Sequence, residues 1–173
     1  EYLTLSEIKA MIDSPCSDER VRRMFLFSCF TGLRSVDIFN LTWNNIVKVE
    51  DGVYQVEVVQ HKTKQLVVVP ITENALMWLP EKGKRKDHEN VFDSPCKVCA
   101  YKVLKQWAET AGIKKNVTFH VGRHTYATLL LYYGADLYTV SKLLGHTDIK
   151  TTQIYAKVMD ETKRKAVNLI PEL

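Results

Sequence analysis

The chain has 173 residues and a net charge of +4 at pH 7, from 24 Lys and Arg against 20 Asp and Glu. Hydrophobic residues make up 46% of it, which is enough for one sizeable core and excludes disordered, collagen-like and highly charged chains. The small positive charge permits a nucleic-acid partner without requiring one; no run approaches the ~20 apolar residues of a membrane span, and the acidic Glu1 and Glu7 are unlike the start of a signal peptide.

Capping residues and apolar spacing predict three helices in the first quarter of the chain. Thr4 and Glu7 form a capping box at the start of the first helix. A second helix is expected at about 18–30 and ends at Gly32. A short third helix is expected at about 35–41.

A Val-rich segment, residues 45–70, breaks the helical pattern. Its alternating apolar residues and an Asp51-Gly52 turn predict strands, and the basic residues 61–64 separate two further strands. We therefore expect a three-stranded antiparallel sheet within an α+β domain that is mainly helical. The basic stretch 82–88 is predicted to be a solvated surface loop, with a loop that contacts DNA as the alternative.

The C-terminal half is predicted to be helical again. Ser94-Pro95 starts a long helix that Gly112 ends; its expected core face consists of Val98, Tyr101, Leu104 and Ala108. Another helix is expected at about 121–133, stopped by Gly134. Asp136 caps the next, which Gly145 ends, with Val140, Leu143 and Leu144 facing inward. In a last short helix at 151–158, Ile154 and Val158 are expected to be buried, with Tyr155 beside them.

The four cysteines do not form a recognisable metal motif. Cys29 lies in an apolar run and is expected in the core. Cys96 and Cys99 form a single C-x-x-C pair, which lacks the second pair of a zinc site. Reduced thiols of a cytosolic protein are the favoured interpretation, and a metal or redox role stays open.

Two polar clusters are predicted at helix starts. Arg34 precedes a helix with Asp37 three residues later, so the carboxylate could orient the guanidinium; a surface ion pair is the simpler alternative. His120, Arg123 and His124 share one face at a helix start, which suits an anion. A zinc pair of the two histidines is rejected because a Val follows His120 where H-E-x-x-H has its Glu. His124 is the better candidate for a structural hydrogen bond in the core.

Three more residues indicate a function only when they are considered together. Alone, His146 after Gly145 could be a surface residue, Tyr155 a packing residue, and Lys62 in the second turn a solvated lysine. Together with two arginines they suggest metal-free chemistry on a phosphodiester. Arg offers a planar fork of donors for phosphate oxygens, a tyrosine can attack phosphorus, and a lysine can protonate the leaving oxygen.

These residues lie in motifs that resemble the tyrosine recombinase (phage integrase) family. The motifs are T-G-L-R-S-V-D-I with L-T-W, H-K-T-K with V-V-V-P-I, H-V-G-R-H-T-Y-A-T, and L-L-G-H-T-D-I-K-T-T-Q-I-Y-A-K-V. Their order matches the family, and the opening Y-L-T-L-S-E-I is similar to the usual entry to its catalytic domain. One position departs: Gly122 stands where the family usually has Leu, which could alter the helix start.

The resemblance implies a role for each matching residue. Arg34 and Arg123 would bind the phosphate, with Asp37 and His124 in support. Lys62 would be the general acid for the 5′-oxygen, His120 would transfer a proton, and His146 would hydrogen-bond the phosphate. Tyr155 would be the nucleophile that forms a 3′-phosphotyrosyl bond. Lys64 and Lys142 are expected to contact DNA.

The resemblance also implies a wider setting. We expect residues 1–173 to form one catalytic domain, with the family's N-terminal DNA-clamping domain absent from this chain. No metal or cofactor is expected. The expected partner is double-stranded DNA, bound by four copies of the chain in a synaptic complex. Free of DNA, the protein is expected to be a monomer, and it is expected to act in the bacterial cytoplasm. Integration or excision of a mobile element is the favoured role; Xer-type resolution of chromosome dimers, a type IB topoisomerase and a DNA-binding module with a structural Tyr155 are the alternatives.

Overall fold

The structure, a computed structural model, describes residues 1–60 and 64–155. In chain order its elements are α1 (Leu5–Asp13), α2 (Glu19–Thr31), α3 (Ser35–Phe39), η1 (Trp43–Asn45), β1 (Ile46–Glu50), β2 (Val53–Val59), β3 (Leu66–Ile71), α4 (Glu73–Leu76), α5 (Lys97–Thr110), α6 (Phe119–Tyr132), α7 (Leu137–Leu144), η2 (Ile149–Thr151) and η3 (Gln153–Tyr155). The α+β fold, mainly helical with one small sheet, is confirmed. Within the described residues no helix is long and apolar enough to cross a membrane.

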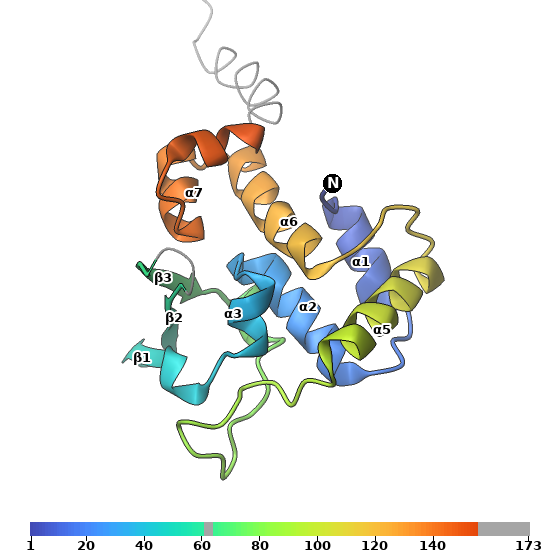
Figure 1. Ribbon diagram of the computed structural model, residues 1–173, viewed down its shortest axis with the longest axis horizontal. Coiled ribbons are helices and arrows are strands. Elements are labelled where there is room, and N and C mark those ends of the chain that lie inside the picture. The colour runs from blue at the N-terminus through green and yellow to red at the C-terminus, as the bar shows by residue number, and fades with distance from the viewer. Residues whose placement is uncertain (61–63, 156–173) are drawn as a thin grey trace, which may run out of the picture.

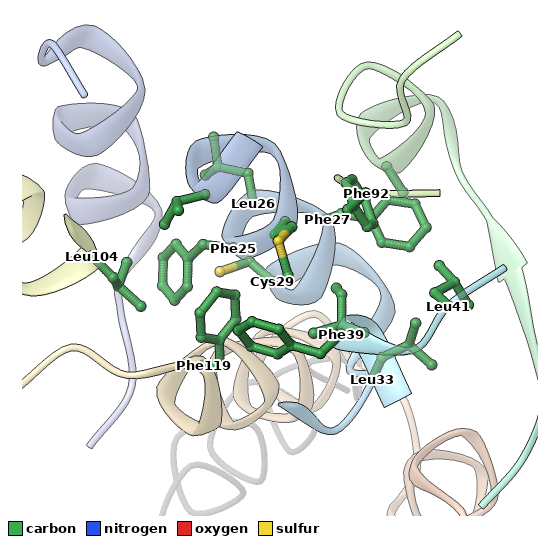
Figure 2. Close-up of a cluster of buried hydrophobic side chains, with 14 of the residues drawn as sticks. Phe25, Leu26, Phe27, Cys29, Leu33, Phe39, Leu41, Phe92, Leu104 and Phe119 are labelled. Atoms are coloured by element: carbon green, nitrogen blue, oxygen red, sulfur yellow. The ribbon is translucent and has the colours of Figure 1, made fainter. Parts of the chain in front are cut away.

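Helix α2 forms the centre of the molecule. It lies between α1 and α5 on one side and the sheet on the other, and α6 packs along it (Figure 1). The unbroken buried run from Met24 to Cys29 explains this position, because a helix that is apolar on all sides must be covered on all sides. Figure 2 shows Phe25 of α2 pointing toward Phe119 at the start of α6, and Phe27 pointing from another side of α2 toward Phe92. The rings of Phe25 and Phe119 meet edge to face, with centroids 6.0 Å apart.

The sheet is the predicted antiparallel meander, in the order β1-β2-β3. Strands β2 and β3 pair from Tyr54–Ile71 to Val59–Leu66. In β3, Val67, Val69 and Ile71 are buried while their neighbours are exposed, as expected for a strand with one face on a core. Strand β3 also packs against α7, so the sheet lies beside the end of that helix.

Most predicted helix ends are confirmed. Thr4 and Glu7 make both bonds of the capping box, Gly32 and Gly145 cap α2 and α7 in the left-handed conformation, and Asp136 accepts the N–H of Thr139. Two of these ends lie in the candidate site described below. Gly32 ends α2 two residues before Arg34, and Gly145 ends α7 directly before His146. These two caps therefore set the direction in which the chain continues to each site residue.

The start of α5 differs from the prediction. The helix begins at Lys97, and Cys96 is its N-cap, with its Sγ accepting the N–H of Cys99 at 3.3 Å. Val98 is 79% exposed rather than in the core, because it lies on the solvent side of the first turn, whereas Leu104 and Ala108 are buried as expected. Leu143, also predicted to face inward, is only partly buried.

The four cysteines are free thiols in the structure. Cys29 is buried as predicted, and burial raises its thiol pKa. Cys96 and Cys99 are both exposed at the start of α5. A hydrogen bond from Cys99 lowers the pKa of the Cys96 thiol.

Gly122 has a packing reason. A Cβ at this position of α6 would lie 2.4 Å from Ser28 Oγ and 3.3 Å from Phe25 Cε2, both in α2. The departure from the family pattern thus allows the close approach of α2 and α6. The helix start itself is regular: Thr118 caps it by accepting the N–H of Val121.

Gly122→Ala is expected to lower the free energy of unfolding by ~1–3 kcal/mol, the usual cost of overpacking. Ser28→Ala removes the clashing oxygen, so in that background the same change should cost much less or stabilise the protein, since Ala favours a helix by ~1 kcal/mol over Gly. Urea unfolding of the four proteins in this double-mutant cycle measures the coupling. Equal costs of Gly122→Ala in both backgrounds would contradict the packing explanation.

Candidate active site

The site is built around Arg123, in the second turn of α6. Its side chain is buried, and Nη1 donates to the carbonyl of Gly32 at 2.7 Å while Nη2 donates to that of Leu144 at 2.6 Å. These carbonyls lie at the C-terminal ends of α2 and α7. Helix C-termini carry partial negative charge, so two helix ends stabilise one buried cation and fix the plane of its guanidinium.

Arg123 keeps its positive charge at neutral pH although its side chain is buried. Desolvation and the nearby cation Arg34 lower its pKa to about 10, while Tyr155 and Asp37 act in the opposite direction. Arg123 is therefore positive at neutral pH. A charged, rigid guanidinium at a site with further cationic groups is suited to bind an oxyanion.

Arg34 and Asp37 lie at the start of α3, directly after the end of α2. Arg34 is the N-cap of α3 and is half-buried, whereas Asp37 is buried. The positive charge of Arg34 lowers the pKa values of both Arg123 and His146. Arg34 and Arg123 therefore both contribute positive charge to the same site. The predicted pairing of Asp37 with Arg34 stays a prediction; the negative charge of Asp37 raises the pKa of Arg123.

His146 follows the left-handed Gly145 and turns back toward Arg123. Its Nε2 lies 3.1 Å from Nη2 of Arg123, and its Nδ1 lies 2.7 Å from Oγ1 of Thr152. Because Arg can only donate, Nε2 is assigned as the acceptor and Nδ1 as the protonated nitrogen. Burial, then Arg123 and Arg34, lowers the pKa of His146 to about 4. To donate a hydrogen bond to phosphate, Nε2 must therefore first gain a proton, which a neighbouring anion favours.

Tyr155 is buried, with 7% of its surface exposed, and its Oη lies 2.5 Å from Nδ1 of His124. The prediction that Ile154 is buried with Tyr155 beside it is wrong: Ile154 is 63% exposed. The segment that carries both residues is a 3₁₀ helix up to Tyr155, so the spacing of an α-helix does not apply. Val158, the other expected core residue, lies outside the described residues. Burial raises the pKa of Tyr155 to about 12, against the lowering effect of Arg123.

Lys62 lies outside the described residues, but the residues on either side of 61–63 hydrogen-bond one another. Gln60 donates its N–H to the carbonyl of Gln65 and accepts that of Lys64, both at 2.9 Å. The Gln60 side chain also donates to the carbonyl of Leu144 at 3.0 Å, the same oxygen that accepts from Arg123. The residue that follows β2 is thus held at the carbonyl that Arg123 also binds.

The remaining predicted residues lie farther out. His120, in the first turn of α6, is exposed, and its ring contacts that of His124. Lys64 is exposed at the β2–β3 turn with φ of 54°. Lys142 places its ammonium over the ring of Tyr138 on the exposed side of α7. DNA contact by these two lysines stays a prediction.

Two residues that hydrogen-bond groups of the site, Gln60 and Thr152, were not predicted from the sequence. Both are buried polar residues that hydrogen-bond the site. The only sequence signal was a polar residue at the end of a predicted strand and a second Thr in T-T-Q-I-Y. Within residues 1–60 and 64–155, no three His, Cys, Asp or Glu side chains form a group that could hold a metal ion.

Two half-buried histidines predict a pH dependence of stability. Burial lowers the pKa of both His124 and His146 from 6.5 to about 4, so the unfolded chain binds more protons than the folded one between these values. The free energy of unfolding should fall as the pH drops from 6.5 to 4. Urea unfolding should show a shallower fall between pH 6.5 and 5 in a His124→Gln/His146→Gln variant, and an unchanged fall in the exposed-loop variant His88→Gln. Equal slopes in all three proteins would contradict these pKa shifts.

Comparison with known proteins places this site in a family. The profile of the phage integrase family matches residues 1–162. A tyrosine recombinase of Pseudothermotoga lettingae is 30% identical over 97% of this chain and 60% of the relative. Tyrosine recombinase XerD of Vibrio cholerae is 32% identical over 96% of this chain and 60% of the relative. The chain thus spans about three fifths of the length of these curated relatives.

Solved structures share the fold. The XerA recombinase superimposes with a TM-score of 0.75 at 25% identity, over 100% of this chain and 64% of that chain. The catalytic domain of the bacteriophage HP1 integrase gives a TM-score of 0.70 at 24% identity, over 98% and 95%. XerH bound to its difH substrate gives a TM-score of 0.72 at 22% identity, over 89% and 49%.

Proposed function

This chain belongs to the phage integrase family, and from that premise we propose that it is the catalytic domain of a site-specific recombinase that cuts and rejoins DNA. The observation that carries the proposal is the placement of Arg123. Two helix C-termini fix its guanidinium, His146 contacts it, and Tyr155 lies close enough to influence its charge. A phosphate bound there would lie near a phenol nucleophile.

The proposed cleavage step needs no metal or nucleotide. Tyr155 attacks phosphorus, a 3′-phosphotyrosyl bond forms, and the 5′-oxygen leaves with a proton from Lys62. Arg34 and Arg123 stabilise the added negative charge of the transition state, with His146 as a further donor. The phosphotyrosyl bond conserves the energy of the diester, so a 5′-hydroxyl of another strand can reverse the step.

Double-stranded DNA is the proposed partner. The DNA complex of the structurally similar XerH supports this assignment, as does the net charge of +4. We propose that four copies of the protein assemble with DNA in the synaptic complex and that the protein is a monomer when free of DNA. The proposed location is the bacterial cytoplasm. Integration or excision of a mobile element is the proposed role. Relatives named XerD favour Xer-type chromosome-dimer resolution as the second candidate.

A library of duplexes with randomised sequence tests the proposal. Each duplex carries a sulfur in place of the 5′-bridging oxygen, so cleavage releases a thiol that rejoins poorly and the covalent complex accumulates. We expect denaturation-resistant protein–DNA complexes on a subset of sequences, in equal amount with and without EDTA. DNA binding without any covalent complex would favour the binding-module alternative. Strong inhibition by EDTA would contradict the metal-free mechanism.

A further inference from the structure

Two cysteines, Cys96 and Cys99, form an exposed pair of free thiols at the start of α5. Cys96 is the N-cap of the helix, and its Sγ accepts the backbone N–H of Cys99 at 3.3 Å. The Cys99 thiol donates a second hydrogen bond to the same sulfur. The two sulfurs are therefore held together, although neither thiol has a part in the proposed DNA cleavage.

The helical turn that carries the pair is fixed from its inner side. Ala100 is fully buried, and the ring of Tyr101 meets that of Phe119 edge to face, with centroids 5.5 Å apart. The ammonium of Lys97 lies over the ring of Phe39, 5.6 Å from its centroid. The two cysteines thus face solvent from a rigid turn. A C-x-x-C pair at a helix N-terminus is an arrangement in which thiols are activated for disulfide exchange.

The two thiols differ in acidity. The hydrogen bonds from the side chain and the backbone of Cys99 lower the pKa of Cys96, and the partial positive charge of the helix N-terminus acts in the same direction. The bond that Cys99 donates to Cys96 raises the pKa of Cys99. Because the thiolate is the nucleophile, Cys96 is suited to attack first and Cys99 to attack second.

The ligand set fits disulfide exchange better than a structural metal site. A structural zinc ion takes four ligands, and within residues 1–60 and 64–155 no three His, Cys, Asp or Glu side chains form a group that could hold a metal ion. Two thiols are sufficient for an intramolecular disulfide. We propose that Cys96 and Cys99 form a thiol–disulfide exchange site, which reacts with low-molecular-weight disulfides and closes reversibly to a Cys96–Cys99 disulfide.

Nearby charges indicate which small disulfides would react. Lys97 lies between the two cysteines in the chain, and the positive charge of Lys102 lowers the pKa of Cys99. Cations beside the thiols attract a disulfide that carries carboxylates. Glutathione disulfide has this chemistry and is the probe used below.

The exchange balances in atoms and electrons. The Cys96 thiolate, having lost its proton to solvent, attacks one sulfur of the small disulfide; a mixed disulfide forms and one small thiolate leaves, which takes up a proton. Cys99 then loses its proton and attacks Sγ of Cys96, and the second small thiolate leaves and is protonated. Two protein thiols are oxidised to one disulfide, and one small disulfide is reduced to two thiols.

The protein disulfide should be easy to reduce again. The hydrogen bonds to the sulfur of Cys96 stabilise the reduced pair, and a stabilised reduced form makes the disulfide a stronger oxidant. Both cysteines are also exposed, and exposed disulfides are typically the labile ones. The pair is therefore expected to follow the ratio of small disulfides to thiols around the protein.

Mass spectrometry of acid-quenched, alkylated samples tests the exchange site. With glutathione disulfide, the reduced protein should lose two hydrogens, with the new bond mapped to Cys96 and Cys99 after proteolysis. An excess of reduced glutathione should reverse this change. Cys99→Ser should instead accumulate glutathione on Cys96, because the second thiol is missing. The matched variant Cys16→Ser, which changes a half-buried cysteine outside the pair, should behave like the unaltered protein.

The order of attack has its own test. At pH 7, glutathione should couple to Cys96 in Cys99→Ser at least ~3-fold faster than to Cys99 in Cys96→Ser, since the thiolate fraction governs attack. Serine is a good N-cap, so both variants should keep α5, which circular dichroism checks. Alkylation rates of the two cysteines in the unaltered protein give the same comparison without a substitution.

Four results would overturn the proposal. They are glutathione adducts on the unaltered protein without a bond between Cys96 and Cys99, a disulfide that includes Cys16 or Cys29 instead, a disulfide that reduced glutathione does not open, and equal reaction rates of the two thiols. These measurements use no DNA, so their outcome is independent of the proposed recombinase function.

Discussion

Arg123→Lys is expected to slow single-turnover DNA cleavage by at least ~10²-fold, the typical loss when one donor to a developing oxyanion is removed. The guanidinium of Arg123 donates to the carbonyls of Gly32 and Leu144 and contacts His146. A lysine ammonium keeps the charge, but it is a single point of donation and cannot span both helix ends while facing a phosphate. The loss of cleavage rate in Arg123→Lys therefore reports the geometry of the guanidinium, because the positive charge is kept.

A second arginine provides the control for this variant. Arg22 of α2 also donates to a backbone carbonyl, that of Ile12 at 2.6 Å, and lies over the ring of Trp78. Arg22→Lys should leave the cleavage rate unchanged, whatever it does to stability. Thermal unfolding of both variants shows that each is folded under the assay conditions. Cleavage by Arg123→Lys within ~5-fold of the unaltered protein would contradict the proposed role of Arg123.

Tyr155→Phe is expected to abolish covalent complexes with DNA while DNA binding persists. The variant keeps the buried ring and removes only the attacking oxygen and its bond to His124, so the stability cost should be ~0.5–1.5 kcal/mol. Gel shift and denaturing gel electrophoresis measure binding and covalent capture on the same samples.

Tyr126 is the matched control for this experiment. It is another tyrosine whose burial raises its pKa to about 12, and it packs against Gly32 at the end of α2. Tyr126→Phe should form covalent complexes normally. Covalent complexes with Tyr155→Phe would show that another residue is the nucleophile.

Local signals in the sequence predicted the ends of the elements that carry the site. Gly32 and Gly145 end α2 and α7 in the left-handed conformation, which glycine adopts at little cost. These glycines also permit close packing: a Cβ on Gly145 would lie 2.3 Å from Val67 Cγ2. The positions of Arg34 and His146 after these ends followed from short-range rules.

Long-range contacts could not be predicted in the same way. Gln60 and Leu144 are separated by 84 positions, and no local pattern shows that both Gln60 and Arg123 bind the carbonyl of Leu144. The orientation of Tyr155 was missed for a related reason. A 3₁₀ segment packs its ring against Leu131, Val140 and Leu144 of α6 and α7, and helical periodicity within the segment predicts neither the 3₁₀ geometry nor these partners. Val98 shows the same limit, because an apolar residue in a first helical turn is buried only if another element covers it.

The attachment site of the DNA tests the central claim most directly. Covalent complexes trapped on 5′-bridging-sulfur duplexes can be digested with nuclease and protease and analysed by tandem mass spectrometry. The account predicts a nucleotide linked through its 3′-phosphate to the phenolic oxygen of Tyr155. Linkage to any other side chain, or through a 5′-phosphate, would contradict it.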